Sequence, residues 1–334
     1  MTGEPTPTAT LRLGLLENAC HSLKRGFQQW QLGKAQRDAW LLKEAFVWVH
    51  HGIELTLKQL LVQTNQFLVF ENVDKAVEEL GKLRKKPGMS EAAVLDLFDS
   101  DQRIQSVGFR KLVRRVNLML NIDELAPAQP LRIYIDDLAQ YRNKITHFSV
   151  EIDVDRAEIL LGDLMAPLLD VLDAHLLDDE FRAECIPEIR SLAQPVRVHV
   201  HELYAAAEAR VLALLRKLSG TEVDGRLLGS SGTIEVPAFS RFDSPRPGQR
   251  GPDIRADSET AIWVVEIVLR SSHLKIRGDL QKLEMYKQEV INQDNEILCW
   301  LVSLDEASDQ VRALAAESGV LFSSAREIAQ LESL

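Results

Sequence analysis

Apolar positions in the first half of the chain recur at intervals of three and four residues, the period of an amphipathic helix. The longest stripe lies between Trp40 and Val62 and contains Ala45, Val49, Ile53, Leu57 and Leu60. Breaks and a new helix start are indicated at Pro87-Gly88, Ser90 and 126–130. Further helices are predicted at 109–120, 133–146 and 155–177. We therefore expect an all-α bundle of four or five helices over residues 11–177.

Beyond residue 195 the pattern becomes that of an α/β domain. Predicted strands lie at 233–239, near Ile254, and at 261–269, 296–304 and 320–323, and predicted helices at 198–218, 275–291 and 309–318. The run Ile262–Leu269 is almost entirely apolar and β-branched, as expected for a central strand covered on both faces. Charges and two prolines interrupt the periodicity between Asp178 and Pro195. We predict a helical domain over 1–180 and an α/β domain with a mixed central sheet over 195–334.

The composition, 46% hydrophobic and 27% charged, is that of a globular protein. No apolar run reaches the roughly 20 residues that a membrane crossing needs, and the polar start has no basic region followed by an apolar one, so no secretory signal is expected. Cys20, Cys185 and Cys299 are far apart and form no CxxC pair. We expect three buried thiols in a reducing compartment, the cytoplasm, and no membrane partner.

Charge is distributed unevenly along the chain, whose formal net charge is −11. Residues 1–150 carry 20 Lys and Arg against 17 Asp and Glu, whereas residues 151–180 carry one Arg against ten acidic residues. The total argues against a protein that coats nucleic acid without specificity. An acidic protein can still bind RNA through a local basic face, so RNA recognition is not excluded.

One set of polar residues in the predicted helix 133–146 has the chemistry needed to cleave a phosphodiester. Arg142, Asn143 and His147 lie within about a turn and a half of one another, so their side chains can converge at one helix end. Arginine binds phosphate bidentately, histidine transfers protons near neutral pH, and asparagine can orient either group. The structural alternative is that Arg142 pairs with Asp136 or Asp137 and that His147 caps a helix.

Other polar groups in this half have simpler interpretations. His50 and His51 are expected to be packing or helix-surface residues, because only Glu54 is near them at ligand spacing. The basic runs 82–86 and 110–115 would usually be solvated faces, although they could guide RNA to a cleft.

Residues 10–178 resemble the HEPN superfamily, on the segment Arg142-Asn143-Lys144-Ile145-Thr146-His147 and on the long helical stretch Lys43–Lys58. The resemblance implies an endoribonuclease that needs no metal or other cofactor and acts as a homodimer. Two copies of the motif would make one composite site, leaving a 2′,3′-cyclic phosphate and a 5′-hydroxyl on RNA. A role in toxin–antitoxin systems or antiviral defence is implied by resemblance only.

In the second half, Pro252-Asp253 precedes Glu266, which lies within the central apolar strand. A carboxylate there needs a partner, and two carboxylates on adjacent strands would bind Mg²⁺ through hard oxygen ligands. The segment resembles the PD-(D/E)xK restriction-endonuclease fold, in which Glu202 on the preceding helix would be a further acid. Val268 stands where that motif has its lysine, so Lys275 or Lys282 would have to replace it.

Three functions therefore remain open. The preferred one is a dimeric ribonuclease whose nuclease-like second domain binds or senses nucleic acid. The second is a Mg²⁺-dependent DNA nuclease that uses the helical half for dimerisation. The third is a non-catalytic nucleic-acid-binding protein in which both sites are degenerate. The structural alternative for Glu266 is that it pairs with a nearby basic residue such as Arg255 or Arg270.

Overall fold

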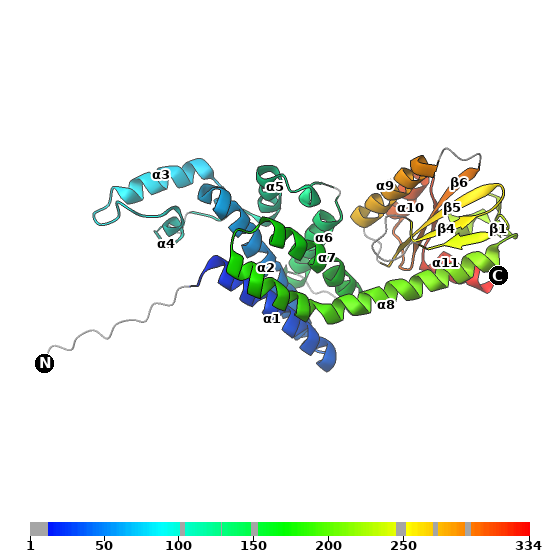
Figure 1. The fold of residues 1–334 in the computed structure, drawn as a ribbon, viewed down its shortest axis with the longest axis horizontal. Coiled ribbons are helices and arrows are strands. Elements are labelled where there is room, and N and C mark those ends of the chain that lie inside the picture. The colour runs from blue at the N-terminus through cyan, green and yellow to red at the C-terminus, as the bar shows by residue number, and fades with distance from the viewer. Residues whose placement is uncertain are drawn as a thin grey trace. The chain divides into compact units, whose positions relative to one another are not determined.

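The computed structural model describes residues 13–100, 104–127, 129–147, 153–244, 252–269, 273–290 and 295–334. These residues form two compact units that do not follow a single cut in the sequence. One unit comprises residues 1–126, 134–152 and 164–194, and the other comprises residues 127–133, 153–163 and 195–334. The first is helical and the second contains a mixed sheet (Figure 1). The predicted order, a helical region followed by an α/β region, is confirmed at this level.

Helices account for most of the first half of the chain. They are α1 (Leu15–Gln36), α2 (Ala39–Thr64), α3 (Val73–Arg84), α4 (Leu97–Ser100), α5 (Phe109–Leu120), α6 (Pro130–His147) and α7 (Val154–His175). The predicted helices at 40–62, 109–120, 133–146 and 155–177 correspond to α2, α5, α6 and α7. The helix start predicted at Ser90 is wrong, because helical residues resume only at the 3₁₀ turn Val94–Asp96. Among the described residues, no helix combines the length and apolar character that a membrane span requires.

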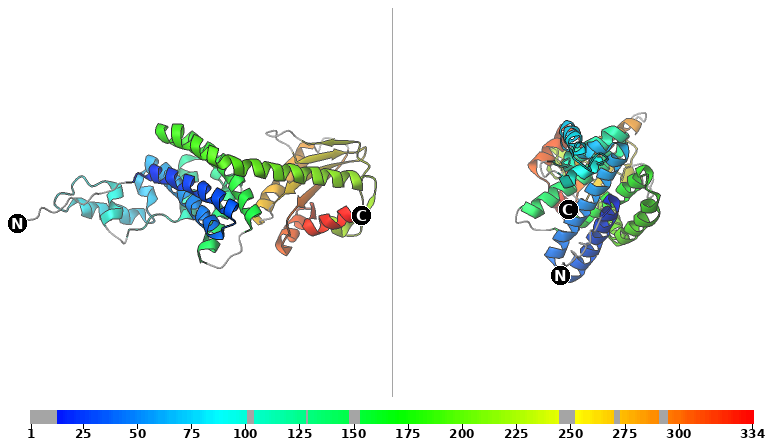
Figure 2. Two further views of the ribbon diagram at one scale, coloured as in Figure 1. Left: turned by 90° about the horizontal axis from the view of Figure 1, so that it is seen from below. Right: turned by 90° about the vertical axis from the view of Figure 1, so that its left-hand side faces the viewer.

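Glycines on both helices set the distance between α1 and α2, which lie side by side as an antiparallel pair (Figures 1 and 2). A Cβ added at Gly26 would lie 2.5 Å from Val49 Cγ2, and one added at Gly52 would lie 2.5 Å from Leu23 Cγ. Each glycine therefore faces a large side chain of the other helix at van der Waals contact. Gly52 is retained for this close packing, which offsets its poor helix propensity.

Replacing Gly52 with alanine is expected to destabilise the protein by about 1–3 kcal/mol, the usual effect of overpacking a core. Helix propensity alone would favour alanine by about 1 kcal/mol. Gly81 on α3 provides the matched control, since a Cβ there meets no atom within 4 Å. Urea unfolding should show Gly81→Ala to be at least as stable as the wild type. A Gly52→Ala protein as stable as the wild type would contradict the packing argument.

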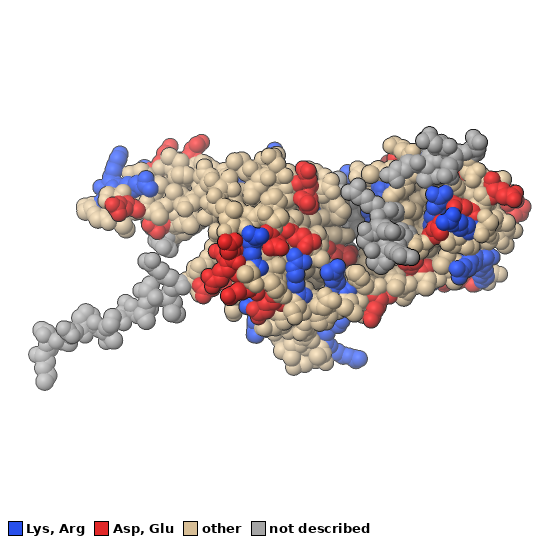
Figure 3. Space-filling view, viewed as in Figure 1, with Lys and Arg blue, Asp and Glu red and all other residues tan. Residues whose placement is uncertain are grey.

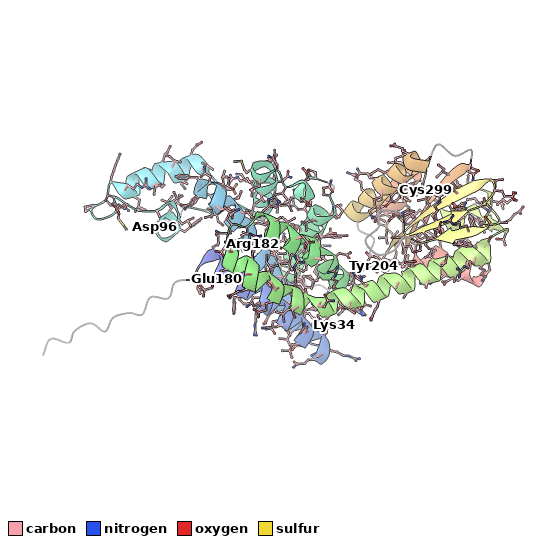
Figure 4. All side chains as sticks on the ribbon, viewed as in Figure 1. Lys34, Asp96, Glu180, Arg182, Tyr204 and Cys299 are labelled. Atoms are coloured by element: carbon pink, nitrogen blue, oxygen red, sulfur yellow. A yellow bond between two sulfur atoms is a disulfide. The ribbon has the colours of Figure 1, made fainter. Side chains whose placement is uncertain are left out.

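A disulfide joins Cys20 on α1 to Cys185, with the two Cα atoms 6.1 Å apart. The prediction of three separate reduced thiols is therefore wrong for this pair. Their separation of 165 residues hides the contact in the sequence, because it is the packing of α1 against the π-helical turn Phe181–Cys185 that brings the two together. Cys299 on strand β6 (Glu296–Ser303) remains a buried thiol (Figure 4). Burial raises its pKa to about 11 and makes it unreactive.

Acidic side chains surround this disulfide. They line a cavity of about 720 Å³ together with Cys20, Cys185, His21 and Lys24, and they are Glu17, Asp178, Glu180, Glu184 and Glu188. Figure 3 shows Asp and Glu gathered over this part of the molecule, and Figure 4 marks Glu180 within it. The acidic segment counted in the sequence thus contributes to a negatively charged surface, which disfavours RNA on this face.

Helix α8 (Ile186–Leu218) is continuous where the sequence predicted an interruption. Pro187 lies near the start of α8, directly after the π-helical turn Phe181–Cys185, so the helical backbone runs through this proline as well. Pro195 lies inside the helix and removes one further hydrogen bond. The compact units nevertheless divide between residues 194 and 195. The predicted helix 198–218 is therefore the second part of a longer helix.

The second unit is built on a five-stranded sheet in the order β3-β4-β5-β6-β7. The strands are β3 (Arg241–Asp243), β4 (Ile254–Asp257), β5 (Ala261–Val268), β6 and β7 (Leu321–Ser323). Strands β3, β4 and β5 are antiparallel neighbours, and β5, β6 and β7 run parallel. The strand predicted at 233–239 is shorter, β2 (Thr233–Glu235), and it pairs with β1 (Glu222–Asp224) in a separate two-stranded sheet.

Both faces of this sheet are covered by helices. Every residue of β5 is buried, as predicted for a central strand. Alternate β5 residues Trp263, Val265 and Ile267 pack in a core with α8 and with α11 (Ala325–Ser333). Ile262, Val264 and Val268 face α9 (His273–Val290) and α10 (Asp309–Glu317) instead. The sheet is the middle layer of three, and α9 connects the parallel strands β5 and β6.

Candidate active site

Helix α6 places Arg142 and Asn143 beside each other near its C-terminal end. Arg142 Nη1 donates a hydrogen bond of 3.0 Å to Asn143 Oδ1. Arg142 is half-buried, and its Nε is buried with no hydrogen-bond partner among the described residues. A buried guanidinium N–H without an acceptor among the described residues costs free energy.

A cavity of about 480 Å³ opens in front of these two side chains, between α2, α5, α6 and Glu71, which lies two residues before α3. Its lining residues are His50, Glu54, Glu71, Gly108, Phe109, Arg110, Lys111, Ala139, Gln140, Arg142 and Asn143. Three of them are cationic and two are acidic. Lys111 pairs with Glu71 at 2.8 Å and Lys58 pairs with Glu54 at 2.6 Å. The carboxylates are thus already compensated, which leaves the cavity with a positive excess.

His147 lies apart from the cavity lining. It is exposed in the last turn of α6, four residues after Asn143, so it is on the same side of the helix as Asn143 and about one turn farther along. The Thr146 hydroxyl, which lies between them in sequence, donates a hydrogen bond of 2.9 Å to the carbonyl of Arg142. Of the three predicted residues, the structure thus brings Arg142 and Asn143 into contact and leaves His147 accessible nearby.

His50 is a site residue that sequence reasoning missed. Its side chain is 3% exposed and lines the cavity, and its ring lies 4.3 Å from that of Phe109. Burial, reinforced by the positive charge of Arg142, lowers the pKa of His50 to about 4, and Glu54 opposes this shift. His50 is therefore a neutral hydrogen-bonding group at physiological pH. Its position in the middle of α2 gives no sequence signal that separates it from a packing residue.

The low pKa of His50 predicts a specific loss of stability in acid. The unfolded chain takes up this proton near pH 6.5 and the folded protein only near pH 4. The contribution is therefore fully present above pH 6.5 and is lost as the pH falls toward 4. At about 1.4 kcal/mol per pKa unit, the loss amounts to about 3 kcal/mol.

His50→Phe should abolish this dependence, because phenylalanine keeps the ring contact and cannot titrate. The neighbouring charged groups, Arg142 on α6 and Glu54 and His51 on α2, are unchanged in the variant. Urea unfolding of both proteins at pH 7, 5.5 and 4 isolates the effect as a difference between them. Identical pH slopes would show that His50 does not titrate as the geometry requires.

The second unit contains another polar cluster, at the β4–β5 pair. Ile254 pairs with Val265, so Asp253, which immediately precedes Ile254, lies next to Glu266 in register. Asp253 Oδ2 accepts a hydrogen bond of 2.6 Å from the backbone N–H of Ile267. Glu266 is buried, as predicted for a carboxylate in the central strand.

Helix α9 brings a lysine to this cluster. Lys282 Nζ lies 3.5 Å from Glu266 Oε2 and 3.4 Å from Asp279 Oδ1. Of the two lysines considered as replacements for the missing motif lysine, Lys282 is thus beside Glu266, whereas the side chain of Lys275 is outside the described residues. Arg255 pairs with Asp257 at 2.7 Å, and Arg270 is also outside the described residues.

Glu202, the third predicted metal ligand, lies on α8 and outside the β4–β5 cluster. Its carboxylate is 72% exposed and 4.0 Å from Nδ1 of His199, one turn earlier. His199 belongs to a different group with Asp155 and Glu158, whose ligand atoms all lie within 4.8 Å of one another. Sequence reasoning did not find that group, because its members come from α7 and α8 and have no motif spacing.

Two candidate sites thus stand in the described residues, one at α6 and one at the β4–β5 pair. The first combines cations and amides around a cavity, and the second combines carboxylates with a lysine. No protein-family model, curated protein or solved structure matches this chain. The functional assignment therefore depends on the chemistry of these two groups of residues.

Proposed function

We propose that this chain is an endoribonuclease that cleaves RNA without a metal ion at the C-terminal end of α6. The observation that carries the proposal is the half-buried Arg142, in contact with Asn143 and facing a cavity with a positive excess. A guanidinium in such a setting binds and stabilises a phosphoryl group. Exposed His147, one turn beyond Asn143, supplies the proton transfer that phosphodiester cleavage requires.

The reaction in this proposal needs no component outside the protein and the RNA. A histidine removes the proton of the 2′-hydroxyl, the 2′-oxygen attacks the adjacent phosphorus, and the bond from phosphorus to the 5′-oxygen breaks. The leaving oxygen takes a proton, which gives a 2′,3′-cyclic phosphate and a 5′-hydroxyl. Arg142 stabilises the charge on the phosphoryl oxygens, and Asn143 holds the Arg142 guanidinium in position.

The reaction includes two proton transfers, one from the 2′-hydroxyl and one to the leaving 5′-oxygen, and each needs its own histidine. We therefore propose that two copies of the motif take part. One His147 acts as the base and His147 of a second protomer acts as the acid, so the functional unit is a homodimer with a composite site. The exposure of His147 at the end of α6 supports this, because a buried histidine could not meet its symmetry copy. The wider role that we propose is that of a toxin or antiviral effector, with the second unit binding or sensing nucleic acid.

Cleavage of labelled total RNA and of duplex DNA, with and without EDTA, tests the proposal. Wild-type protein should cleave RNA in EDTA, and His147→Ala should not. His201→Ala is the matched control, since His201 is exposed on α8 and outside both candidate sites. Loss of RNA cleavage in EDTA, or retention of full activity by His147→Ala, would refute the proposal.

A second candidate is a Mg²⁺-dependent DNA nuclease at the β4–β5 pair. The specific observation in its favour is Lys282, which places an ammonium group next to Glu266 although Val268 stands in the usual lysine position. The donor set fits Mg²⁺, since Asp253 and Glu266 offer the hard oxygen ligands that this ion prefers. A bound Mg²⁺ would polarise the phosphate, while Lys282 would orient the attacking water. DNA nicking that EDTA and Asp253→Asn abolish, and that His147→Ala retains, would favour this candidate.

A further inference from the structure

The cavity in front of Arg142 contains more polar groups than the proposed cleavage reaction uses. Arg110, Lys111 and His50 all line it, and none of them is needed for the proton transfers at His147. They come from the start of α5 and the middle of α2, two elements that the α6 motif does not include.

The N-terminus of α5 is directed at this space. Its first three residues, 109–111, all line the cavity, and its N-cap residue Gly108 has no side chain to bond the orphan N–H groups of the first turn. Unpaired N–H groups and the positive end of the helix dipole together attract anions. The Glu71 carboxylate shows this attraction, because its Oε2 accepts a 3.1 Å hydrogen bond from the Gly108 N–H.

His50 is an independent indication of a ligand. Its side chain is only 3% exposed and lines the cavity. Its imidazole forms no hydrogen bond with any of the described residues. A buried polar group in a native protein normally has a hydrogen-bond partner. Because His50 lines the cavity, a ligand bound there would be in position to supply this partner.

The charge balance selects the kind of ligand. Glu71 and Glu54 are paired with Lys111 and Lys58, which leaves Arg110 and Arg142 as the uncompensated charges of the lining. With Arg142 assigned to the phosphate being cleaved, the guanidinium of Arg110, the helix N–H groups and a neutral imidazole donor remain, and together they are complementary to a second phosphate, which accepts several hydrogen bonds at once.

We propose that this cavity is a phosphate-binding subsite, formed by Arg110, His50 and the start of α5, that holds the backbone phosphate next to the one being cleaved. The inference rests on the proposed ribonuclease function, and it adds the direction in which the RNA strand crosses the site. Asn143, in the lining, and His147 are four residues apart, about 6 Å along the helix axis. This spacing is on the scale of one nucleotide, so an RNA strand would run along α6 from the subsite to His147.

Binding is measured separately from cleavage with a fluorescently labelled 2′-O-methyl RNA oligonucleotide, which lacks the attacking hydroxyl. Arg110→Gln is expected to weaken binding about tenfold or more, the effect of losing one charge-assisted hydrogen bond. Arg110→Lys should recover part of the loss. Arg25→Gln on α1 makes the same change at an exposed position away from the cavity, and it should bind as the wild type does. His50→Phe should also weaken binding. Because Arg110 is exposed, its substitution tests the site without disturbing the core.

Competition by adenosine monophosphate and by inorganic phosphate distinguishes the sources of the anion. Weak competition by both supports a subsite for the RNA backbone. Competition by the mononucleotide as strong as that by RNA, and equally weakened by Arg110→Gln, would support the phosphate site and reassign it to a free nucleotide. Equal binding by wild type, Arg110→Gln and His50→Phe would overturn the inference, even if the protein cleaves RNA. Binding that depends on these residues without any cleavage would leave the subsite standing and refute the ribonuclease proposal.

Discussion

Replacing Arg142 with alanine is expected to slow RNA cleavage by about 100- to 1,000-fold, the usual effect of removing one group that stabilises charge in the transition state. The guanidinium faces the cavity and contacts Asn143, so the substitution removes the cation and leaves Asn143 without its hydrogen bond. Arg142→Lys restores the charge but not the planar, bidentate geometry, and it should recover only a fraction of the rate. Initial rates in EDTA measure both effects.

Lys144 provides the control for this prediction. It is an exposed cation two residues farther along α6, and it does not line the cavity. Lys144→Ala should therefore cleave RNA at nearly the wild-type rate. If Lys144→Ala lost as much activity as Arg142→Ala, positive charge at the end of α6 would matter in general, and the specific role of Arg142 would be refuted.

The second large effect concerns the disulfide between Cys20 and Cys185. Cys185→Ser is expected to lower the free energy of unfolding by about 2–4 kcal/mol, because the bond restricts the unfolded chain. The same loss should follow when dithiothreitol reduces the wild type. Urea unfolding with and without the reductant measures both.

Cys20→Ser should behave as Cys185→Ser does, and the double variant should lose no more than either single one, since all three lack the same bond. Dithiothreitol should not affect any of these variants. Cys299→Ala serves as the thiol control, because that thiol is buried and unbonded to another cysteine. A wild type whose stability is indifferent to the reductant would show that the bond does not contribute.

Elements with a clear apolar period could be predicted from the sequence. Helix α5 is found at the predicted bounds 109–120, and strand β5 ends within one residue of its predicted end. Helix α5 has apolar positions at helical spacing, and β5 is a short, β-branched apolar run, each typical of its element type. Helix ends are harder to predict from proline positions. Pro195 favours a break in the helix, and yet it lies inside α8. The local preference of proline is therefore overridden at this position.

Contacts between distant segments could not be predicted, because no local pattern encodes them. The disulfide joins residues 165 positions apart, and the α1–α2 approach at Gly52 depends on the register of two helices. At the candidate site, the residue types of Arg142 and Asn143 pointed to phosphate chemistry. His50 and the start of α5 became site residues only when three helices were placed around one cavity.

The same reason explains the second cluster. Asp253 and Glu266 could be predicted as neighbours from the strand order, since both carboxylates border one antiparallel pair. Which lysine would accompany them could not, because Lys275 and Lys282 are both on α9. The structure places Lys282 Nζ 3.5 Å from Glu266 Oε2, a contact that depends on the register of α9 against β5.

The most direct test of the central claim is to incubate wild-type protein in EDTA with an RNA oligonucleotide and with its 2′-O-methyl copy, and to determine the product masses. We predict fragments with a 2′,3′-cyclic phosphate and a 5′-hydroxyl from the RNA, an intact methylated copy, and no cleavage of either by His147→Ala. Cleavage of the methylated copy, or cleavage of RNA only when Mg²⁺ is supplied, would contradict a metal-free reaction at Arg142 and His147.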